Sequence, residues 1–474
     1  MTEHVKSYYA ASANQHAPYP TLTEQLECDV CVIGAGYTGL SSALHLVEKG
    51  YKVVVLEAAR VGFGASGRNG GQIVNSYSRD IDTIEANCPP DQARLLGSML
   101  FEGGQIIRER IKRYNIQCDL QEGGVFAAET EKQLHELKAQ YERWQKWGND
   151  QLELLDADGV REVVASDRYV GALLDKSGGH IHPLNLALGE AEAIRMQGGQ
   201  IFEQSAVTSI TPGQPALVKT AKGAVKARFV VVAGNAYLGN LVPELAGKSM
   251  PCGTQVIATE VLGEERARAL LPQNYCLEDC NYLLDYYRTT GDHRLIYGGG
   301  VVYGARDPAD IERLIIPKMQ KTFPQLADVK VEYTWTGNFL LTLSRLPQFG
   351  RIGHNIYYMQ GYSGHGVTCT HLAGRLISEL LRGDAERFDA RGDGLQLLFG
   401  DFFERRAGGV AVERVDHDLP RADFADQAQP CRDLLFGGVV DPLPVELPAQ
   451  EHRLHGQVPV EAFHLIDDPP YGIG

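Results

Sequence analysis

Apolar and polar positions near the start of the chain predict a strand, a turn, a helix and a second strand, in that order. Residues 30–33 form a short apolar run that is typical of a buried parallel strand. Apolar residues then recur at helical spacing over 40–47, and residues 53–56 form a second apolar run. The pattern therefore predicts a βαβ unit whose first strand enters its helix through a turn at 34–39.

That turn carries the glycine spacing of a dinucleotide-binding site. Gly34, Gly36 and Gly39 have the spacing G-x-G-x-x-G, and Glu57 follows the second strand. The first glycine permits the tight turn, the second lets a pyrophosphate approach the backbone, and the third lets helix and strand pack closely. The pyrophosphate then lies at the positive end of the helix dipole, and Glu57 accepts hydrogen bonds from the ribose hydroxyls. The whole unit predicts dinucleotide binding.

The remaining pattern alternates between helices and strands before it becomes rich in strands. Helical spacing predicts helices over 91–114, 130–147, 156–164 and 184–196, and strands are expected at 169–175, 200–202, 206–210, 217–220 and 229–232. From 250 to 338 the chain is strand-rich, with one helix over 308–323. Grouped strands of this kind predict a second, mainly antiparallel sheet inserted into an α/β domain. A strand at 356–359, a glycine turn and a helix over 368–381 then complete the first domain.

These patterns divide the chain into five regions. We expect residues 1–27 to be an arm packed on the surface of the first domain. Residues 28–249 form mainly the dinucleotide-binding domain, with part of the second domain. Residues 250–345 form mainly the β-rich domain in which the substrate is selected, and residues 346–390 return to the first domain.

Residues 391–474 depart from the rest of the chain. They hold 8 of the 22 prolines and no lysine, and their 15 acids against 7 arginines supply −8 of the net charge of −15. Their hydrophobic periodicity is poor, so we expect a weakly ordered segment. One hypothesis is that a frameshift in the coding DNA replaced the original ending, and the alternative is a genuine appended segment. Translation of the other two frames beyond codon 390 distinguishes the two.

Composition is that of a globular protein with two domains. The 474 residues are 44% hydrophobic and 22% charged. The net charge of −15 disfavours nucleic acid or an anionic membrane surface as a partner, and it is compatible with a cationic substrate. No run of 18 apolar residues predicts a transmembrane segment, and the N-terminus lacks the apolar core of a signal peptide. We therefore expect a cytoplasmic protein.

The nine cysteines are scattered, which favours reduced thiols. Cys28 and Cys31 form a C-x-x-C pair, a spacing also found in redox and zinc motifs. Here the pair lies in a predicted strand, where residues three apart point to opposite faces. We interpret both as buried structural cysteines and expect no metal site.

Two further glycine-rich loops are more elaborate than an NAD-binding domain needs. They are GFGASGRNGGQ at 62–72 and QGYSGHGVTCTH at 360–371. Together with SYYAASANQHAPYPTL, SGGHIHPLNLALGEA, NYLLDYYRTT, GGGVVYGARDP and WTGNFLLTLSRLPQFGR, they resemble the D-amino-acid oxidase superfamily of FAD-dependent amine oxidoreductases. The resemblance covers about residues 5–390. It implies a Rossmann-like FAD-binding domain of the GR2 type with an inserted, mainly antiparallel β-sheet domain for the substrate.

The resemblance implies several groups of FAD contacts. Pyrophosphate and ribose are implied at Gly34, Ala35, Gly36, Tyr37, Thr38, Gly39, Glu57 and Ala58. The second loop runs beside the pyrophosphate and flavin with Ala65, Ser66, Arg68, Asn69, Gly70, Gly71 and Gln72. The adenosine side is implied at Val207, Ala233 and Gly234, and the pyrimidine edge of the flavin at Gly361, Ser363, Gly364, His365, Gly366, Val367 and Thr368. The helix that begins at this edge can stabilise negative charge on the reduced ring. Because the loops at which relatives attach flavin have no cysteine or histidine here, non-covalent FAD is implied.

The implied chemistry is hydride transfer from the carbon that bears a primary amine to flavin N5. The imine then hydrolyses to an aldehyde and ammonia, and oxygen or another acceptor reoxidises the flavin. The implied substrate is γ-glutamylputrescine, oxidised to γ-glutamyl-γ-aminobutyraldehyde with ammonia and hydrogen peroxide in putrescine breakdown. The alternatives are a same-fold oxidoreductase of another amine, glycine, sarcosine or a D-amino acid, or an inactive flavin-binding product with an altered ending.

Candidate substrate contacts are His182, Gln255, Tyr286, Arg288, Trp335, Asn338 and His365. Aromatic rings can form a slot for an alkylamine, and an arginine can pair with a glutamyl carboxylate. The aromatics around Tyr286 also alternate like strand residues, so core packing is the alternative. No acid–base catalyst is required if the amine binds deprotonated.

Overall fold

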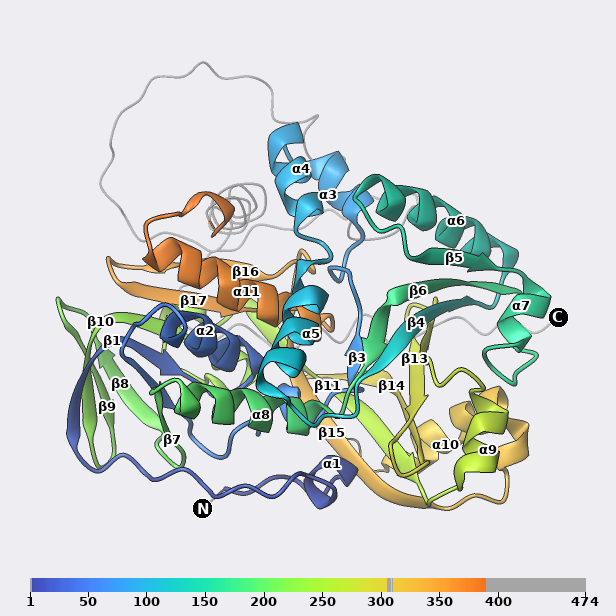
Figure 1. The fold of residues 1–474 in the computed structure, drawn as a ribbon, viewed down its shortest axis with the longest axis horizontal. Helices are drawn as coiled ribbons and strands as arrows, with labels where there is room; N and C mark the ends of the chain where they lie inside the picture. Colours follow the sequence, from blue (N-terminus) through green and yellow to red (C-terminus); the bar gives the residue numbers. More distant parts are fainter. Residues whose placement is uncertain (1, 305–307, 309, 389–474) are drawn as a thin grey trace, which may run out of the picture. The chain divides into compact units, whose positions relative to one another are not determined.

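Two β-sheets organise the part of the chain that the structure describes (Figure 1). The computed structural model describes residues 2–304, 308 and 310–388. The predicted weak order from residue 391 onward lies outside these residues, as does the frameshift hypothesis.

The first sheet holds eight strands in the described residues, six of them in the order β16-β17-β10-β1-β2-β7. Their bounds are β1 Gln25–Ile33, β2 Val53–Leu56, β7 Gln200–Phe202, β8 Val207–Thr211, β9 Ala216–Thr220, β10 Ala224–Val232, β16 Gln348–Ile352 and β17 Ile356–Gln360. β1 is parallel to both β2 and β10, with Val30 opposite Val53 and Phe229. This parallel centre confirms the predicted βαβ unit, because parallel neighbours require a crossover connection.

Helices α2 (Tyr37–Val47), α5 (Glu102–Tyr114), α8 (Pro183–Met196) and α11 (Gly366–Leu381) pack together beside this sheet (Figure 1). The predicted helix over 91–114 is instead two helices, α4 (Pro90–Ser98) and α5. The break lies between Gly97 and Gly103, where glycine weakens helical structure. In the described part of the chain, no helix combines the length and apolar character needed to cross a membrane.

The second sheet holds nine strands in the described residues, in the order β15-β11-β14-β13-β12-β4-β6-β3, with β5 paired to β6. Four come from one part of the chain, β3 Gln72–Ile73, β4 Gln121–Ala128, β5 Leu152–Leu155 and β6 Gly171–His180. The others are β11 Ser249–Thr259, β12 Cys276–Asp279, β13 Asp285–Thr289, β14 Leu295–Tyr303 and β15 Val331–Thr342. The two groups join where β12 pairs in parallel with β4, and the other pairs are antiparallel.

The strand expected at 169–175 continues to His180, through residues expected to be a loop. Gln72 of β3 and Gln121 of β4 both lie opposite His180, so strands distant in the sequence supply its hydrogen-bonding partners. The extension was not visible in the sequence, because residues 177–180 have no apolar alternation of their own.

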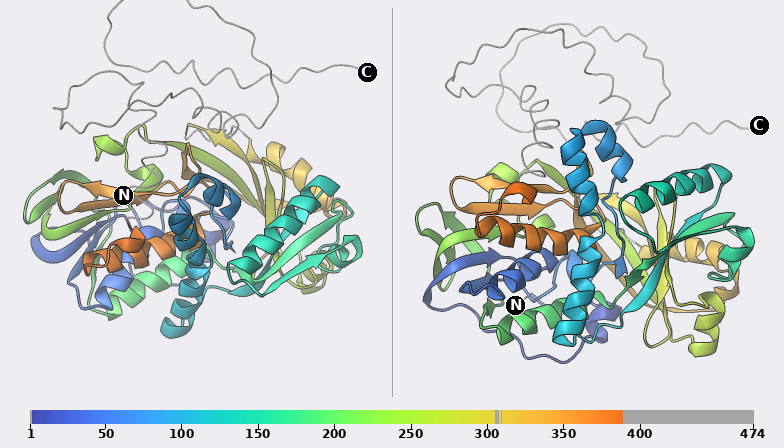
Figure 2. Two further views of the ribbon diagram at one scale, coloured as in Figure 1. Left: turned by 90° about the horizontal axis from the view of Figure 1, so that it is seen from above. Right: turned by 45° about the horizontal axis from the view of Figure 1, so that its top comes forward.

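Helices pack on both faces of the second sheet. α6 (Glu131–Lys146), which begins at a Thr130–Gln133 capping box, lies over β4, β5 and β6 (Figure 2). On the opposite face lie α7 (Ala157–Arg161), α9 (Glu264–Leu270) and α10 (Ile311–Thr322). α3 (Ile81–Asn87) instead contacts α4. Ile315 and Met319 of α10 pack with Tyr287 and Tyr297 in one buried cluster.

The N-terminal arm contains α1 (Tyr8–Ala11) and reaches farther than expected. Tyr9 is fully buried, with its ring 5.2 Å from that of Trp335 in β15 and 5.1 Å from that of His182. The arm therefore does not only cover the first domain, as predicted, but also packs against the second sheet. Burial of the aromatic ring favours this insertion.

Cys28 and Cys31 are buried free thiols, as predicted. Both nevertheless lie in the same buried cluster, so the expectation of opposite faces is wrong. The N–H groups of Asp29 and Val30 both donate to the carbonyl of Lys52. Two residues opposite one is the pattern of a bulge, which shifts the alternation of side chains between the two cysteines.

Candidate functional site

A cavity of about 610 Å³ lies where the carboxyl ends of β1, β2 and β10 face the second sheet. Ligand cavities commonly have ~300–1,000 Å³, and open α/β sheets bind ligands at the carboxyl ends of their strands. The position and size of this cavity therefore suit a large ligand.

Most residues expected to contact FAD line the cavity. They are Gly34, Gly36, Tyr37, Thr38, Glu57, Ala58, Ala65, Ser66, Arg68, Asn69, Gly70, Gln72, Val207, Ala233, Gly234, Ser363, Gly364, His365, Gly366 and Val367. Segments more than 300 residues apart in sequence thus meet around one space.

The remaining expected contacts, Ala35, Gly39, Gly71, Gly361 and Thr368, lie behind the lining and shape it. A Cβ at Gly39 would overlap the carbonyl of Gly34, so this glycine allows α2 to pack against the turn. Gly71 has φ +84°, and a Cβ there would overlap the carbonyl of Ile181. These positions support the backbone of the cavity wall.

The N-terminus of α2 is open toward the cavity. Gly36 is its N-cap residue, and no side chain caps the helix. The N–H of Tyr37 donates to Ser66 Oγ at 2.9 Å, which leaves the hydroxyl hydrogen of Ser66 free to donate to another group. A helix N-terminus beside a hydroxyl donor fits an anion such as a pyrophosphate.

Glu57 lies at the end of β2 and lines the same cavity. Its carboxylate accepts hydrogen bonds of 2.8 Å from the N–H groups of Ala35 and Ala59. Burial raises the pKa of this carboxyl, and the two N–H donors oppose the rise. Each oxygen has a lone pair left for a hydroxyl donor, which suits a ribose.

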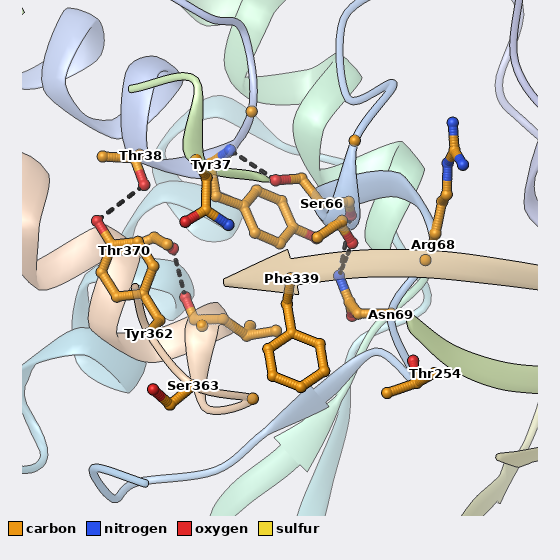
Figure 3. Close-up of a pocket in the computed structure, with 18 of the residues that line it drawn as sticks. Tyr37, Thr38, Ser66, Arg68, Asn69, Thr254, Phe339, Tyr362, Ser363 and Thr370 are labelled. Carbon is orange, nitrogen blue, oxygen red and sulfur yellow. Dashed lines mark hydrogen bonds between the residues drawn. The ribbon is translucent and has the colours of Figure 1, made fainter. Parts of the chain in front are cut away.

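His365 is the N-cap residue of α11, at the opposite part of the cavity. Its Nδ1 is buried and has no hydrogen-bond partner in the described residues. Burial lowers the pKa of the imidazole to about 4, so the ring is neutral at pH 7. Nearby, Thr38 Oγ1 donates to the hydroxyl of Tyr362 at 2.9 Å and ties α2 to the loop before α11 (Figure 3). The site thus offers an unpaired imidazole and a second open helix N-terminus.

Two of the candidate substrate contacts, Tyr286 and His365, line the cavity. Gln255 and Asn338 do not, whereas their neighbours Thr254 and Phe339 do (Figure 3). Successive side chains of a strand point to opposite faces, so a shift of one residue separates the candidates from the actual lining.

His182, Arg288 and Trp335 also lie outside the lining, and each is engaged in the scaffold. His182 Nδ1 accepts a hydrogen bond from the N–H of Asn185 at 3.1 Å and caps α8. Arg288 Nε donates to the carbonyl of Gly70 at 2.7 Å, and Trp335 Nε1 donates to that of Arg68 at 2.9 Å. The last two hold the 62–72 loop in place.

Several residues that line the cavity were not predicted from the sequence. Phe63 and Tyr237 flank Arg68, whose guanidinium lies 4.5 Å from the Phe63 ring centre. Thr254, Phe339, Asn235, Glu278, Arg79 and Arg345 also line the cavity. Asn235 directly follows a glycine at a strand end, a signal that could have identified it, but Glu278 has no comparable local signal.

Comparisons with known proteins agree with this geometry. A model of the family described as FAD dependent oxidoreductase matches residues 29–380. The chain is 72% identical over 391 residues to gamma-glutamylputrescine oxidoreductase of Escherichia coli (strain K12), covering 82% of this chain and 92% of that protein. It is 43% identical over 392 residues to the probable oxidoreductase OrdL of Haemophilus influenzae, covering 81% and 90%.

Among solved structures, L-proline dehydrogenase from P. horikoshii matches with a TM-score of 0.66 at 21% identity, covering 82% of this chain and 99% of that one. This likeness shows the fold. Since the family model spans most of the chain and the open helix ends suit a dinucleotide, the chain belongs to the family of FAD-dependent oxidoreductases, with FAD as its cofactor.

Proposed function

We propose that the protein oxidises the primary amine of γ-glutamylputrescine, yielding γ-glutamyl-γ-aminobutyraldehyde, ammonia and hydrogen peroxide. The observation that carries this proposal is the 72% identity over 391 residues to an oxidoreductase named for that substrate. The cavity adds support, because it can hold a dinucleotide and still extends to the second sheet.

The proposed placement of FAD follows the two open helix ends. The N-terminus of α2 and the Ser66 hydroxyl would hold the pyrophosphate, Glu57 the ribose, and the N-terminus of α11 the pyrimidine edge of the flavin. When bound, FAD supplies the acceptor for the hydride that leaves the amine-bearing carbon. The loops at 62–72 and 337–348 contain no cysteine or histidine, which supports a non-covalent cofactor.

The second sheet provides groups that suit the rest of the substrate. γ-Glutamylputrescine has an ammonium at one end, an alkyl chain and amide in the middle, and an amino-acid group with a carboxylate at the other end. Tyr282, Leu283 and Tyr303 are exposed and line the cavity, so they can cover the alkyl chain. Arg79 and Arg345 line it without an ion pair to any described residue, and either can pair with the carboxylate.

Oxygen as the final electron acceptor and a cytoplasmic location are further parts of the proposal. Hydrogen peroxide is the product when molecular oxygen, which is small and diffusible, accepts the two electrons. The cysteines of the described residues are free, which is typical of a reducing compartment.

An anaerobic flavin-reduction screen tests the proposal. The purified holoenzyme is mixed with γ-glutamylputrescine, putrescine, glycine, sarcosine or a D-amino acid, and bleaching of the flavin is followed. We expect γ-glutamylputrescine to bleach the flavin fastest, with one peroxide formed per turnover once oxygen is admitted. If another amine reduces the flavin while γ-glutamylputrescine leaves it oxidised, the substrate assignment is wrong.

A further inference from the structure

Glu278 is an acidic residue in the cavity wall that the functional assignment leaves unused. It belongs to β12, in which successive side chains point to opposite faces. Leu277 packs in the cluster under α10, and Asp279 joins a polar network on that side. Glu278 lies between them in sequence and lines the cavity instead.

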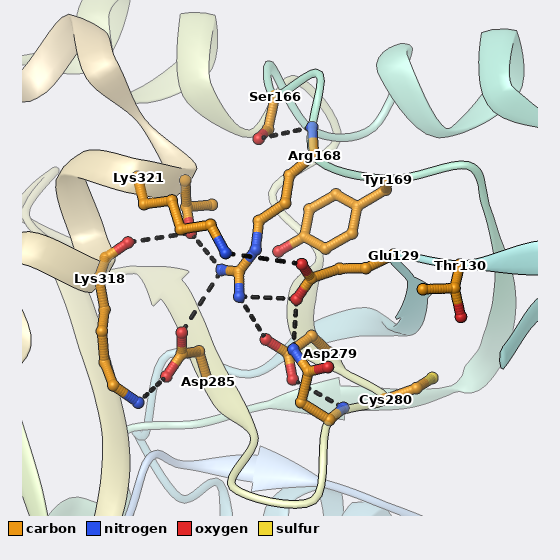
Figure 4. Close-up of polar contacts among 12 residues, drawn as sticks. Glu129, Thr130, Ser166, Arg168, Tyr169, Asp279, Cys280, Asp285, Lys318 and Lys321 are labelled. Carbon is orange, nitrogen blue, oxygen red and sulfur yellow. Dashed lines mark hydrogen bonds and ion pairs between the residues drawn. The ribbon is translucent and has the colours of Figure 1, made fainter. Parts of the chain in front are cut away.

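Glu278 and Asp279 have contrasting surroundings. Asp279 receives a hydrogen bond of 3.2 Å from Arg168, whose guanidinium also contacts Glu129 at 2.7 Å and Asp285 at 3.4 Å (Figure 4). The carboxylate of Glu278 has no hydrogen bond or ion pair with any described residue. The fold thus pairs the acid that faces the protein interior and leaves unpaired the acid that faces the cavity.

The position of Glu278 places it next to the loop assigned to the flavin. Tyr286 of β13 lies directly opposite Glu278 in the sheet. The ring of Tyr286 packs on Gly70, since a Cβ there would lie 2.7 Å from Tyr286 Cε2. Gln72 follows in the same loop, and its side-chain amide donates to the carbonyl of Leu277 at 3.2 Å. Glu278 therefore lies in the cavity wall beside the 62–72 loop, which the family resemblance places next to the flavin.

Several charged or titratable groups surround this carboxyl. They are the thiols of Cys276 and Cys280, the carboxylates of Asp279 and Asp175, and the phenol of Tyr286, while Arg79, Arg345 and His365 line the same cavity. Burial, and then the charge of Asp279, raise the pKa of Glu278 to about 7. A carboxylate of this kind is a stronger base than an ordinary glutamate.

We propose that Glu278 binds the reacting ammonium group of the substrate and accepts one of its protons. The proposal rests on the amine oxidation proposed above. An N–H bond of the ammonium breaks, its electron pair stays on nitrogen, and the proton forms an O–H bond with the carboxylate. Glu278 becomes neutral, the amine becomes neutral, and Glu278 later releases the proton to solvent.

This step removes an obstacle to the oxidation. An alkylammonium has a pKa near that of lysine, ~10.4, so only about one amine in 10³ is neutral at pH 7. The nitrogen lone pair must be free to support departure of the hydride from the neighbouring carbon. A carboxylate in the cavity attracts the abundant ammonium form first and then supplies the base that converts it.

The test compares two ligands and three variants. The ligands are γ-glutamylputrescine and N-butyl-γ-glutamide, which has the same chain without the ammonium. Binding to the dithionite-reduced holoenzyme, which cannot oxidise either ligand, is measured by calorimetry. The variants are Glu278→Gln, Glu278→Asp, and the control Glu265→Gln, which changes an exposed acid of α9.

For the wild type we expect γ-glutamylputrescine to bind more tightly than the butyl amide above pH 7. Glu278→Gln weakens binding of γ-glutamylputrescine about 10- to 100-fold and leaves that of the butyl amide unchanged. The wild-type rate of anaerobic flavin reduction rises with an apparent pKa near 7 in the free enzyme. In Glu278→Gln this rise moves toward the pKa of the amine, ~10. Glu278→Asp restores part of the lost affinity, and Glu265→Gln behaves as wild type.

Equal loss of affinity for both ligands in Glu278→Gln, or an unchanged pH profile, overturns the proposal. If Glu278→Gln fails to fold or to retain FAD, the pH dependence of ligand binding by the wild type tests the proposal. Its preference for the charged ligand must then fall as the pH drops from 8 to 5, and a constant preference overturns the proposal. A wrong substrate assignment can be told apart from a wrong role for Glu278. In that case another amine reduces the wild-type flavin, and the same variants are then compared with that amine.

Discussion

The guanidinium of Arg288 donates a hydrogen bond of 2.7 Å from Nε to the carbonyl oxygen of Gly70. It also donates to the hydroxyl of Tyr9 at 3.0 Å and to the carbonyl of Thr289 at 3.1 Å. One buried cation thus ties β13 of the second sheet to the 62–72 loop and to the N-terminal arm. Arg288, a candidate for binding a substrate carboxylate, is therefore a positioning residue in this geometry.

Replacing Arg288 by methionine should destabilise the holoenzyme by about 2–4 kcal/mol, because it leaves the buried acceptors of Gly70 and Tyr9 unpaired. FAD should also bind about tenfold more weakly, since the 62–72 loop lines its cavity. Urea unfolding and flavin retention on a desalting column measure both effects, with the exposed Arg195→Met as control. A variant with full FAD content and stability that is changed only in KM would instead indicate direct substrate binding.

Gly71→Ala should destabilise the protein by about 2–4 kcal/mol. Its φ of +84° disfavours a side chain, and a Cβ would also overlap the carbonyl of Ile181. Gly198→Ala is a matched control, because Gly198 has φ +88° but nothing within 4 Å of the added Cβ. The control should lose only about 1 kcal/mol. Equal urea midpoints for the two variants would show that the close approach of backbones at Gly71 is unimportant.

Glu278→Gln should stabilise the protein at alkaline pH. The pKa of Glu278 is raised to about 7 in the folded state, against 4.5 as the ordinary value. The favourable contribution of the protonated carboxyl is therefore complete below pH 4.5 and is lost as the pH rises through 7. We expect the free energy of unfolding of the glutamine variant to exceed that of the wild type by about 3 kcal/mol at pH 8.5 and to match it at pH 4.5. Urea unfolding at the two pH values measures this, and a pH-independent difference would argue against a buried charge at this position.

Arg345→Gln should raise the KM for γ-glutamylputrescine about tenfold and change the maximal rate of flavin reduction little. An arginine that pairs with the distant carboxylate contributes to binding rather than to chemistry at the amine. Putrescine, which lacks the glutamyl group, serves as the internal comparison, and the exposed Arg313→Gln is the control variant. An equal rise in KM for the two amines would exclude Arg345 from carboxylate recognition and would leave Arg79 as the candidate.

The elements around the cofactor cavity were largely predictable. β1, α2 and β2 follow from an apolar run, helical spacing and three glycines, all of which are local signals. The same holds for β17 and α11, whose boundaries differ by one or two residues from those expected. Short-range pattern suffices here because each element buries its own apolar face.

The substrate side of the cavity was much less predictable. Gln255 and Asn338 were predicted to contact the substrate, and their strands do border the cavity. The residues of these strands that line it are instead Thr254 and Phe339. The face that a strand turns toward a cavity depends on pairing register and bulges, and the β11–β14 register shifts between Gly253 and Gln255. No local pattern records such a shift.

By itself, the sequence determined the dinucleotide-binding unit, the family and the segments that form the cavity, because glycine spacing and hydrophobic periodicity are properties of neighbouring residues. Only the tertiary structure decided that Arg288 binds a loop carbonyl, that β12 joins two distant halves of one sheet, and that Glu278 remains unpaired while Asp279 meets Arg168. The charge environment of a side chain depends on which distant strands and helices approach it, and that is set by the packing of the whole fold.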